Sequence, residues 1–158
     1  MASTAKTLTF VIPAYNMESY LDRCVNSLLS ASDISDLEVL IVDDGSKDGT
    51  LEYARKLERT NPGAVRAIHQ ENKGHGGAVN TGIAAATGMY VKVVDADDWV
   101  DPQAIDTVLA TLRAQHDTDE PIDMLVTNYV YDKVAKRHKT VVNFRRVMEA
   151  GRVLGWDD

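Results

Sequence analysis

The sequence has little cysteine and no long apolar run. Cys24 is the only cysteine among the 158 residues, so an internal disulfide is excluded and a reducing, cytoplasmic compartment is expected. No apolar segment approaches the roughly 20 residues that a membrane-spanning helix needs. We therefore expect neither a disulfide-stabilised secreted domain nor a membrane-spanning protein.

Positive charge is also scarce. The formal net charge is −7, which argues against nucleic acid as a partner because phosphate binding needs a basic surface. Lysine and arginine concentrate in the stretch 133–152 near the end of the chain. We expect the segment DKVAKRHKT, residues 132–140, to be a solvated hairpin; contact with an anionic acceptor or with the inner face of the cell membrane is the alternative.

Strand and helix patterns alternate along the sequence. Apolar residues make up 44% and charged residues 26% of the chain, as in an ordinary globular domain. Buried strands are predicted from their β-branched and apolar runs. The predicted strands are 8–15, 37–44, 65–70, 90–97 and 123–132. Apolar residues spaced by three and four, or small apolar residues, predict helices over 18–31, 50–60, 77–88 and 101–115.

This alternation predicts an α/β fold with a mostly parallel sheet flanked by helices. Asp101 and Pro102 are expected as the N-cap and first residue of the last helix, and Gly88 as the residue that ends the third. After residue 132 the pattern indicates a turn and a further strand, an antiparallel addition near the C-terminus. The final residues resemble the start of another helix, so we expect the chain to be the amino-terminal part of a longer protein.

Polar segments follow the first four predicted strands. They read PAYNMES, DDGSKDGT, HQENKGHGGAVN and DADDW. In open α/β sheets, ligands bind beyond the carboxyl ends of the strands, so these four exits are expected to form one site.

The fourth exit concentrates carboxylates. Asp95 and Asp97 are two positions apart, so their side chains would point to the same side of an extended segment. Like charges about 4 Å apart cost on the order of 4 kcal/mol at an effective dielectric of 20. A divalent cation, Mg²⁺ or Mn²⁺, would relieve this repulsion, and it would complete its coordination with substrate phosphates. The alternative is a solvated acidic turn.

The other exits offer groups that could contact a nucleotide. Asp43 and Asp44 could accept hydrogen bonds from a base or a ribose, Lys73 could face a phosphate, and Tyr15 could stack on a base. His75 is a further candidate contact. The alternatives are a turn and helix cap for Asp43 and Asp44, packing for Tyr15, and an exposed, solvated side chain for Lys73 and His75. Neither the phosphate-binding P-loop pattern nor the G-x-G-x-x-G dinucleotide pattern is present.

Three segments resemble the family 2 glycosyltransferases, which have the GT-A fold. They are VIPAYNMESYLDRCVNSLL, LEVLIVDDGSKDGT and NKGHGGAVNTGIAAATGMYVKVVDADDWV, in the order and spacing of that family, and the resemblance covers residues 7–112. It implies a nucleotide-sugar donor, most often a UDP-sugar, a divalent metal, and one nucleotide-sugar-binding domain over residues 1–158.

The resemblance also assigns roles to individual residues. By it, Asp97 would ligate the metal, and Asp95, the first residue of the D-x-D motif, would contact the ribose or a metal-bound water. The remaining residues would surround the nucleotide: Pro13, Ala14 and Tyr15 at the base, Glu18 nearby, Asp43 and Asp44 at base and ribose, and Lys73, Gly74 and Asn80 along the pocket.

The acceptor half of the family pattern has no counterpart in this sequence. The family's general base and acceptor site normally lie well beyond the D-x-D segment, so the catalytic base is unknown. We expect a saccharide or lipid-linked acceptor and transfer with inversion by the whole protein, whereas this chain would bind the donor. A non-catalytic nucleotide-sugar-binding module, a nucleotidyltransferase and a dehalogenase-type hydrolase are the alternative functions.

Overall fold

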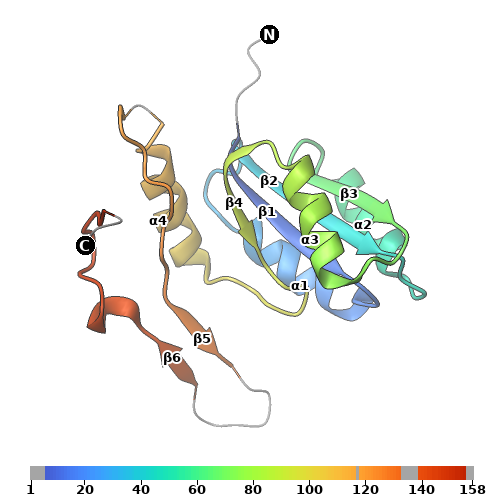
Figure 1. The fold of residues 1–158 in the computed structure, drawn as a ribbon. Helices are drawn as coiled ribbons and strands as arrows, with labels where there is room; N and C mark the ends of the chain where they lie inside the picture. Colours follow the sequence, from blue (N-terminus) through green and yellow to red (C-terminus); the bar gives the residue numbers. More distant parts are fainter. Residues whose placement is uncertain (1–5, 117, 133–138, 156–158) are drawn as a thin grey trace. The chain divides into compact units, whose positions relative to one another are not determined.

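The computed structural model describes residues 6–116, 118–132 and 139–155 (Figure 1). The chain divides into two compact units, Met1–His116 and Asp117–Asp158. That residues 1–158 form one nucleotide-sugar-binding domain stays a prediction.

The first unit is a parallel α/β sheet, as the sequence predicts. Its four strands have the order β3-β2-β1-β4, and every neighbouring pair is parallel. Four helices alternate with them. In chain order the elements are β1 (Lys6–Ala14), α1 (Glu18–Leu28), β2 (Leu37–Asp44), α2 (Thr50–Thr60), β3 (Val65–Gln70), α3 (Gly74–Ala85), β4 (Gly88–Val93) and α4 (Pro102–Arg113).

Helices cover both faces of this sheet, which explains why the central strands are continuous apolar runs. In Figure 1, α3 lies on one face and α1 and α2 lie on the other. All eight residues of β2 are buried. Val11, Leu40 and Val42 form one buried cluster with Ala78 of α3. On the opposite face, α1 buries its apolar stripe, Leu21, Cys24, Val25 and Leu28.

Helix α3 packs unusually close to β1, and its small residues allow this. A Cβ added to Gly82 would lie 2.2 Å from Cγ1 of Val11. Any side chain at this position would therefore push the helix off the sheet.

Both ends of α3 differ from the prediction of a helix over 77–88. The helix begins at Gly74, three residues earlier, and Gly88 is the first residue of β4 rather than the end of the helix. Gly88 lies against β1: its N–H donates to Oγ1 of Thr9 over 2.9 Å, and an added Cβ would be 2.6 Å from the Thr9 nitrogen. The glycine is needed for close strand packing and not for a helix stop.

The start of α4 is confirmed. Asp101 accepts hydrogen bonds from the backbone N–H groups of Gln103 (2.9 Å) and Ala104 (3.1 Å), and Pro102 occupies the first turn. These are the partners that an N-cap aspartate satisfies.

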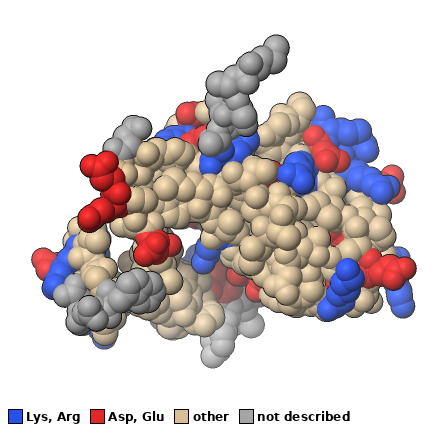
Figure 2. All heavy atoms as spheres, turned by 45° about the horizontal axis from the view of Figure 1, so that its top comes forward, with Lys and Arg blue, Asp and Glu red and all other residues tan. Residues whose placement is uncertain are grey.

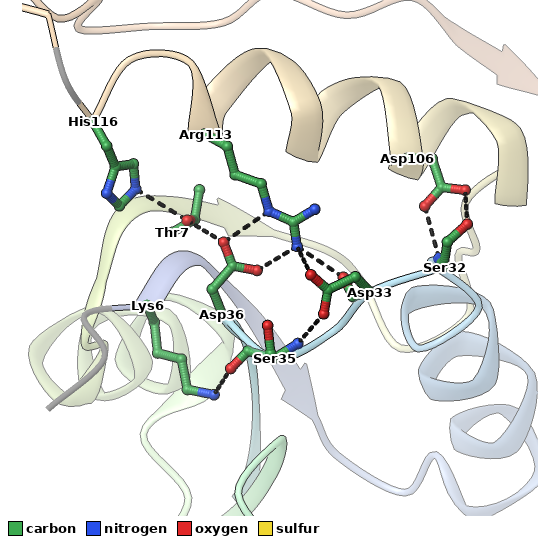
Figure 3. A network of polar contacts seen from close by, with 9 residues as sticks. All are labelled: Lys6, Thr7, Ser32, Asp33, Ser35, Asp36, Asp106, Arg113 and His116. Atoms are coloured by element: carbon green, nitrogen blue, oxygen red, sulfur yellow. Dashed lines mark hydrogen bonds and ion pairs between the residues drawn. The ribbon is translucent and has the colours of Figure 1, made fainter. Parts of the chain in front are cut away.

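A polar network ties the end of α4 to the chain around the start of β2 (Figure 3). Arg113 donates to both carboxylate oxygens of Asp36 and to the carbonyl oxygen of Asp33. Its hydrogen bonds lower the pKa of Asp36 to about 2, against the opposing effect of burial. Asp106 accepts from both the N–H and the hydroxyl of Ser32. This network lies away from the carboxyl ends of the strands and is structural.

The second unit contains a two-stranded antiparallel sheet. Strand β5 (Tyr129–Tyr131) pairs with β6 (Thr140–Val142), and a 3₁₀ helix, η1 (Phe144–Arg146), follows. The antiparallel addition is confirmed, although the predicted strand over 123–132 is only three residues long. No described residue of this unit is buried, so apolar packing cannot extend the strand.

Two further expectations concern this end of the chain. Most of the basic hairpin turn, residues 133–138, lies outside the described residues. The helix expected in the final residues is absent from the described ones, where η1 is the single helical element. In the described part of the chain, no helix combines the length and apolar character required to cross a membrane.

Candidate functional site

The four polar exits meet at one edge of the sheet because all four strands are parallel. Ala14, Asp43 and His69 occupy one row of the register across β1, β2 and β3. The chain runs from β1 outward to β3 and then returns to add β4 on the other side of β1. The point where the order reverses therefore lies between β1 and β4, where open α/β sheets form their ligand crevice. The loop after β1 and the acidic segment after β4 flank this point.

The acidic segment after β4 forms a tight turn. The N–H of Asp98 donates to the carbonyl oxygen of Asp95 over 2.9 Å, and the side chains of Asp95, Asp97 and Asp98 are exposed. Burial, followed by the charges of Asp97 and Asp95, raises the pKa of the Asp98 carboxyl. The turn therefore concentrates negative charge, and a cation bound there would relieve it.

Side chains of helix α1 contact this turn and support it. Sγ of Cys24 donates to the carbonyl oxygen of Asp95 over 3.7 Å, and the N–H of Val100 donates to Oγ of Ser27 over 3.1 Å. The guanidinium of Arg23 stacks 3.2 Å from the centre of the Trp99 ring. Burial, then the charges of Asp98, Asp97 and Asp95, raise the pKa of the Cys24 thiol to about 12. The thiol is therefore protonated and can act as the donor.

The sequence interpretation missed this support. It assigned none of Arg23, Cys24, Ser27 and Trp99 to the site. The spacing of Arg23, Cys24 and Ser27 on α1 is the sequence signal for this support. The residues that these three side chains contact can be identified only once the strand order is known.

Two loops at the same edge are joined by hydrogen bonds. The backbone N–H of Asn16 donates to Oγ of Ser46 (3.0 Å), and Oδ1 of Asn16 accepts from the N–H of Lys47 (2.8 Å). Glu18 accepts from the N–H of Gly49 over 3.1 Å. Asn16 has a positive φ of 55°, a conformation that asparagine tolerates better than most residues. Glu18, predicted to lie near the nucleotide, therefore fixes the β2–α2 loop in this structure.

Asp43 and Asp44 are buried and already bonded. Oδ2 of Asp43 lies 2.7 Å from Nδ1 of His69. Oδ1 of Asp44 accepts from Nε2 of Gln70 (2.6 Å) and from the N–H of Lys73 (2.8 Å). Burial would raise the pKa of Asp44, but these hydrogen bonds outweigh it and lower the pKa. Both carboxylates shape the exits around them, and their predicted contacts with base and ribose remain predictions.

The other predicted site residues divide by exposure. Pro13 and Ala14 are buried as the last two residues of β1, and Tyr15, the first residue of the following loop, is 40% exposed. Lys73, Gly74 and Asn80 are exposed at and beyond the start of α3. Gly74 has a φ of +77°, which suits glycine at the entry to the helix. The first turn of α3 thus faces the same edge as Tyr15, and the role of each residue remains a prediction.

One histidine links two of the exits. Nε2 of His75, in the first turn of α3, lies 3.0 Å from Oδ1 of Asp95. Both side chains are more than half exposed. The exits after β3 and β4 therefore contact each other directly beside the acidic turn.

The acidic turn offers the ligand type that Mg²⁺ and Mn²⁺ prefer, namely carboxylate oxygen. Within the described ranges, no group of three or more His, Cys, Asp or Glu side chains is arranged to hold a metal by itself. Asp95 and Asp97 thus fit a cation that takes its remaining ligands from water and from the phosphates of a bound substrate.

The face drawn in Figure 2 gives no comparable charge signal. On the face drawn in Figure 2, acidic and basic side chains form small groups separated by uncharged surface. This mixture is typical of a solvated globular surface. The acidic turn, and not a charged patch on this face, is the feature that points to a ligand.

Comparison with known proteins agrees with this geometry. The family model described as "Glycosyl transferase family 2" matches residues 9–145. Over 106 residues the chain is 42% identical to the chondroitin synthase of Escherichia coli and 40% identical to an uncharacterized glycosyltransferase of Nostoc. Each alignment covers 67% of this chain, but 15% and 33% of the two relatives. The chain thus spans a third or less of their length.

Solved structures show the same fold. S. aureus TarS 1–349 in complex with UDP-GlcNAc superposes with a TM-score of 0.62 and 28% identity, over 70% of this chain and 32% of that one. The mannosyltransferase PcManGT of Pyrobaculum calidifontis, in complex with GDP-Man and Mn²⁺, gives a TM-score of 0.61 and 28% identity, over 73% and 34%. The parallel sheet described above is therefore the GT-A sheet.

Proposed function

Because the chain belongs to glycosyl transferase family 2, we propose that it binds a nucleotide-diphosphate sugar, a UDP-sugar in the first instance. The whole protein would transfer the sugar to an acceptor hydroxyl, with inversion at the anomeric carbon. Complexes of TarS with UDP-GlcNAc and with UDP support the choice of uridine. The complex of PcManGT with GDP-Man supports the wider class of nucleotide-sugar donors.

The observation that carries the proposal is the acidic turn at the point where the strand order reverses. Asp95, Asp97 and Asp98 lie in one turn beside the loop after β1, and their charges act on one another. Without a cation, these carboxylates would repel the negatively charged diphosphate. With a divalent cation bound to them, they would form a site that attracts the diphosphate.

In this proposal Asp97 holds Mn²⁺ or Mg²⁺, and Asp95 contacts the ribose or a metal-bound water. When bound, the cation would supply Lewis-acid stabilisation of the negative charge that develops on the departing diphosphate. The Mn²⁺ in the PcManGT complex supports this choice of cofactor.

The remaining residues of the site would bind and orient the donor. Tyr15 would stack on the base, while Asp44 keeps the N–H of Lys73 turned inward and so fixes the loop that carries the Lys73 side chain. Pro13 and Ala14, which are buried at the end of β1, would lie next to the base. The acceptor hydroxyl would lose its proton to a carboxylate base that the sequence does not identify.

The compartment and acceptor belong to the same proposal. The single cysteine supports a reducing, cytoplasmic location. A saccharide or lipid-linked acceptor fits a family of sugar transferases, and the basic segment 132–140 would contact the inner face of the membrane.

Calorimetry with UDP tests the donor site. We expect UDP to bind in the presence of Mn²⁺ and to bind at least about tenfold more weakly in EDTA, because the phosphates then face unneutralised carboxylates. Asp97→Asn should remove this metal dependence. Asp119→Asn, which removes an exposed carboxylate of the second unit, should leave it unchanged.

The proposal fails if the wild-type chain binds UDP equally well with and without Mn²⁺, or not at all. If UDP binds as expected, competition with GDP and CDP establishes which base the site prefers. Hydrolysis or transfer of a UDP-sugar by the whole protein would distinguish a transferase from a module that only binds the donor.

A further inference from the structure

We infer that His75 is a positioning residue for the D-x-D motif: it fixes the Asp95 carboxylate in the orientation that receives the metal-bound nucleotide. This inference rests on the proposed donor site. Its basis is the 3.0 Å contact between Nε2 of His75 and Oδ1 of Asp95. A carboxylate oxygen only accepts, so Nε2 carries the proton and the imidazole is the donor.

The backbone before His75 is held on both sides. The N–H of Lys73 donates to the buried Asp44, and the N–H of Gly74 donates to Oδ1 of Asn72 over 3.2 Å. Gly74 enters the helix with its positive φ, and the helix starts there. The imidazole is therefore presented by the first turn of a 12-residue helix and not by an unsupported loop.

Asp95 is held from its other side as well. Its carbonyl oxygen accepts from the Cys24 thiol and from the N–H of Asp98. The backbone of Asp95 is thus fixed by α1 and by the turn, which leaves the side chain as the part still free to rotate. His75 engages one carboxylate oxygen, and Oδ2 remains available for a metal-bound water, the second of the two contacts proposed for Asp95.

Stability does not explain this pair. The side chains of His75 and Asp95 are 65% and 57% exposed, and exposed ion pairs contribute about 0–1 kcal/mol. The pair instead joins the exits after β3 and β4 at a turn in which the carboxylates of Asp95, Asp97 and Asp98 repel one another. Without the imidazole, the Asp95 carboxylate could turn away from Asp97 and Asp98 and leave the orientation that a ligand needs.

The test measures Mn²⁺ and UDP binding by the full chain, with no activity readout. Mn²⁺ affinity in the presence of UDP is measured by electron paramagnetic resonance of the free ion, and UDP affinity in EDTA by calorimetry. His75→Ala should weaken Mn²⁺ binding about tenfold, the lower end of the effect of removing a partner that orients a metal ligand. UDP binding in EDTA should change less than twofold. His75→Gln, which keeps an N–H donor on a flexible side chain, should recover most of the loss.

Two controls make the result specific. His116→Ala removes an exposed histidine that contacts Thr7 in the network of Figure 3, and it should not change Mn²⁺ binding. In an Asp95→Asn background, His75→Ala should cause no further loss, because the two residues act through one contact.

Each other outcome overturns the inference. Unchanged or tighter Mn²⁺ binding by His75→Ala would show that the imidazole does not orient Asp95 for the cation. An equal loss with and without metal would show that His75 does not act through the cation, and a full further loss in the Asp95→Asn background would show that it does not act through Asp95. Absence of Mn²⁺-dependent UDP binding by the wild-type chain would instead overturn the proposed function.

Discussion

At the scale of single residues, the aspartates at the strand ends fall into two groups. Asp43 and Asp44 are buried and bonded to His69, Gln70 and the backbone of Lys73. Asp95 and Asp97 are exposed at the next exit. A buried carboxylate that already accepts several hydrogen bonds organises its loop, whereas an exposed one in an acidic turn leaves oxygen atoms accessible to a cation. The predicted contacts of Asp43 and Asp44 with base and ribose remain predictions.

Asp98 is predicted to destabilise the free protein. Its pKa is raised above the ordinary value of 3.8 by burial and by Asp97 and Asp95, so its ionised form costs stability at neutral pH. Asp98→Asn should raise the free energy of unfolding at pH 7 by about 0.5 kcal/mol, a magnitude typical of largely exposed charges. The gain should vanish as pH falls through the raised pKa and then below 3.8, where both states bind the proton. Urea denaturation at pH 7 and pH 3 measures it.

Asp106→Asn provides the matched control with the opposite sign. Hydrogen bonds from the Ser32 side chain and backbone lower the pKa of Asp106. Its stabilising effect is therefore present above the ordinary pKa and is lost as pH falls, so this variant should be less stable than wild type at pH 7. Loss of stability in Asp98→Asn at pH 7 would show that the carboxylate makes a favourable contact in the turn.

At the scale of secondary-structure elements, α3 connects the core to the site. Its middle packs on β1 and β2 through Ala78 and Gly82, while its first turn carries His75 to Asp95. A helix with larger residues on this face would stand further from the sheet, and its first turn would move with it. The small residues of α3 therefore set both packing and the position of the site.

Gly82→Ala should destabilise the protein through overpacking. The added Cβ would meet Cγ1 of Val11 at 2.2 Å, and overpacking a core costs about 1–3 kcal/mol. Val11→Ala in the same chain should relieve part of this overpacking. The loss in the free energy of unfolding of the double variant should therefore be smaller than the sum of the losses of the two single variants. Urea denaturation of all three variants measures the coupling.

Gly76→Ala is the matched control in the same helix. A Cβ at Gly76 meets no atom within 4 Å, and alanine favours a helix by up to about 1 kcal/mol over glycine. This variant should therefore be equal to or more stable than wild type. Equal destabilisation by both substitutions would show that the contact with Val11 is not the cause.

The elements also show how far the sequence predicts the structure. Strands β1 to β3 and helices α2 and α4 follow from apolar periodicity and from caps such as Asp101. Both ends of α3 were misplaced, because glycine signals a helix stop, a close approach and a helix entry alike. The role of Gly88 is seen only from its contact with Thr9 on the neighbouring strand, and that of Gly74 from its positive φ and its hydrogen bond to Asn72 in the same loop. The strand order, and with it the His75–Asp95 contact, requires the tertiary fold.

At the scale of the whole molecule, the two units differ in how they are built. The first unit buries both faces of β1 and β2, with side chains such as Ile12 and Leu40 fully covered. No described residue of the second unit is buried, and the ring of Tyr129 packs against those of Tyr131 and Phe144 at its surface. A two-stranded sheet of this kind is marginally stable alone.

Hydrogen exchange followed by mass spectrometry should therefore separate the two units of this chain. Amides of β1 and β2 should exchange only through global unfolding, whereas those of β5 and β6 should exchange through local opening, because so little apolar surface secures them. Added UDP and Mn²⁺ stabilise the state that binds them, by about 2.7 kcal/mol at a ligand concentration of 100 times Kd. Protection should rise in the segments 15–18, 71–76 and 94–99 and in the strands of the first sheet. If β5 and β6 are as strongly protected as β1 without ligand, the second unit has a stability that its surface packing does not explain.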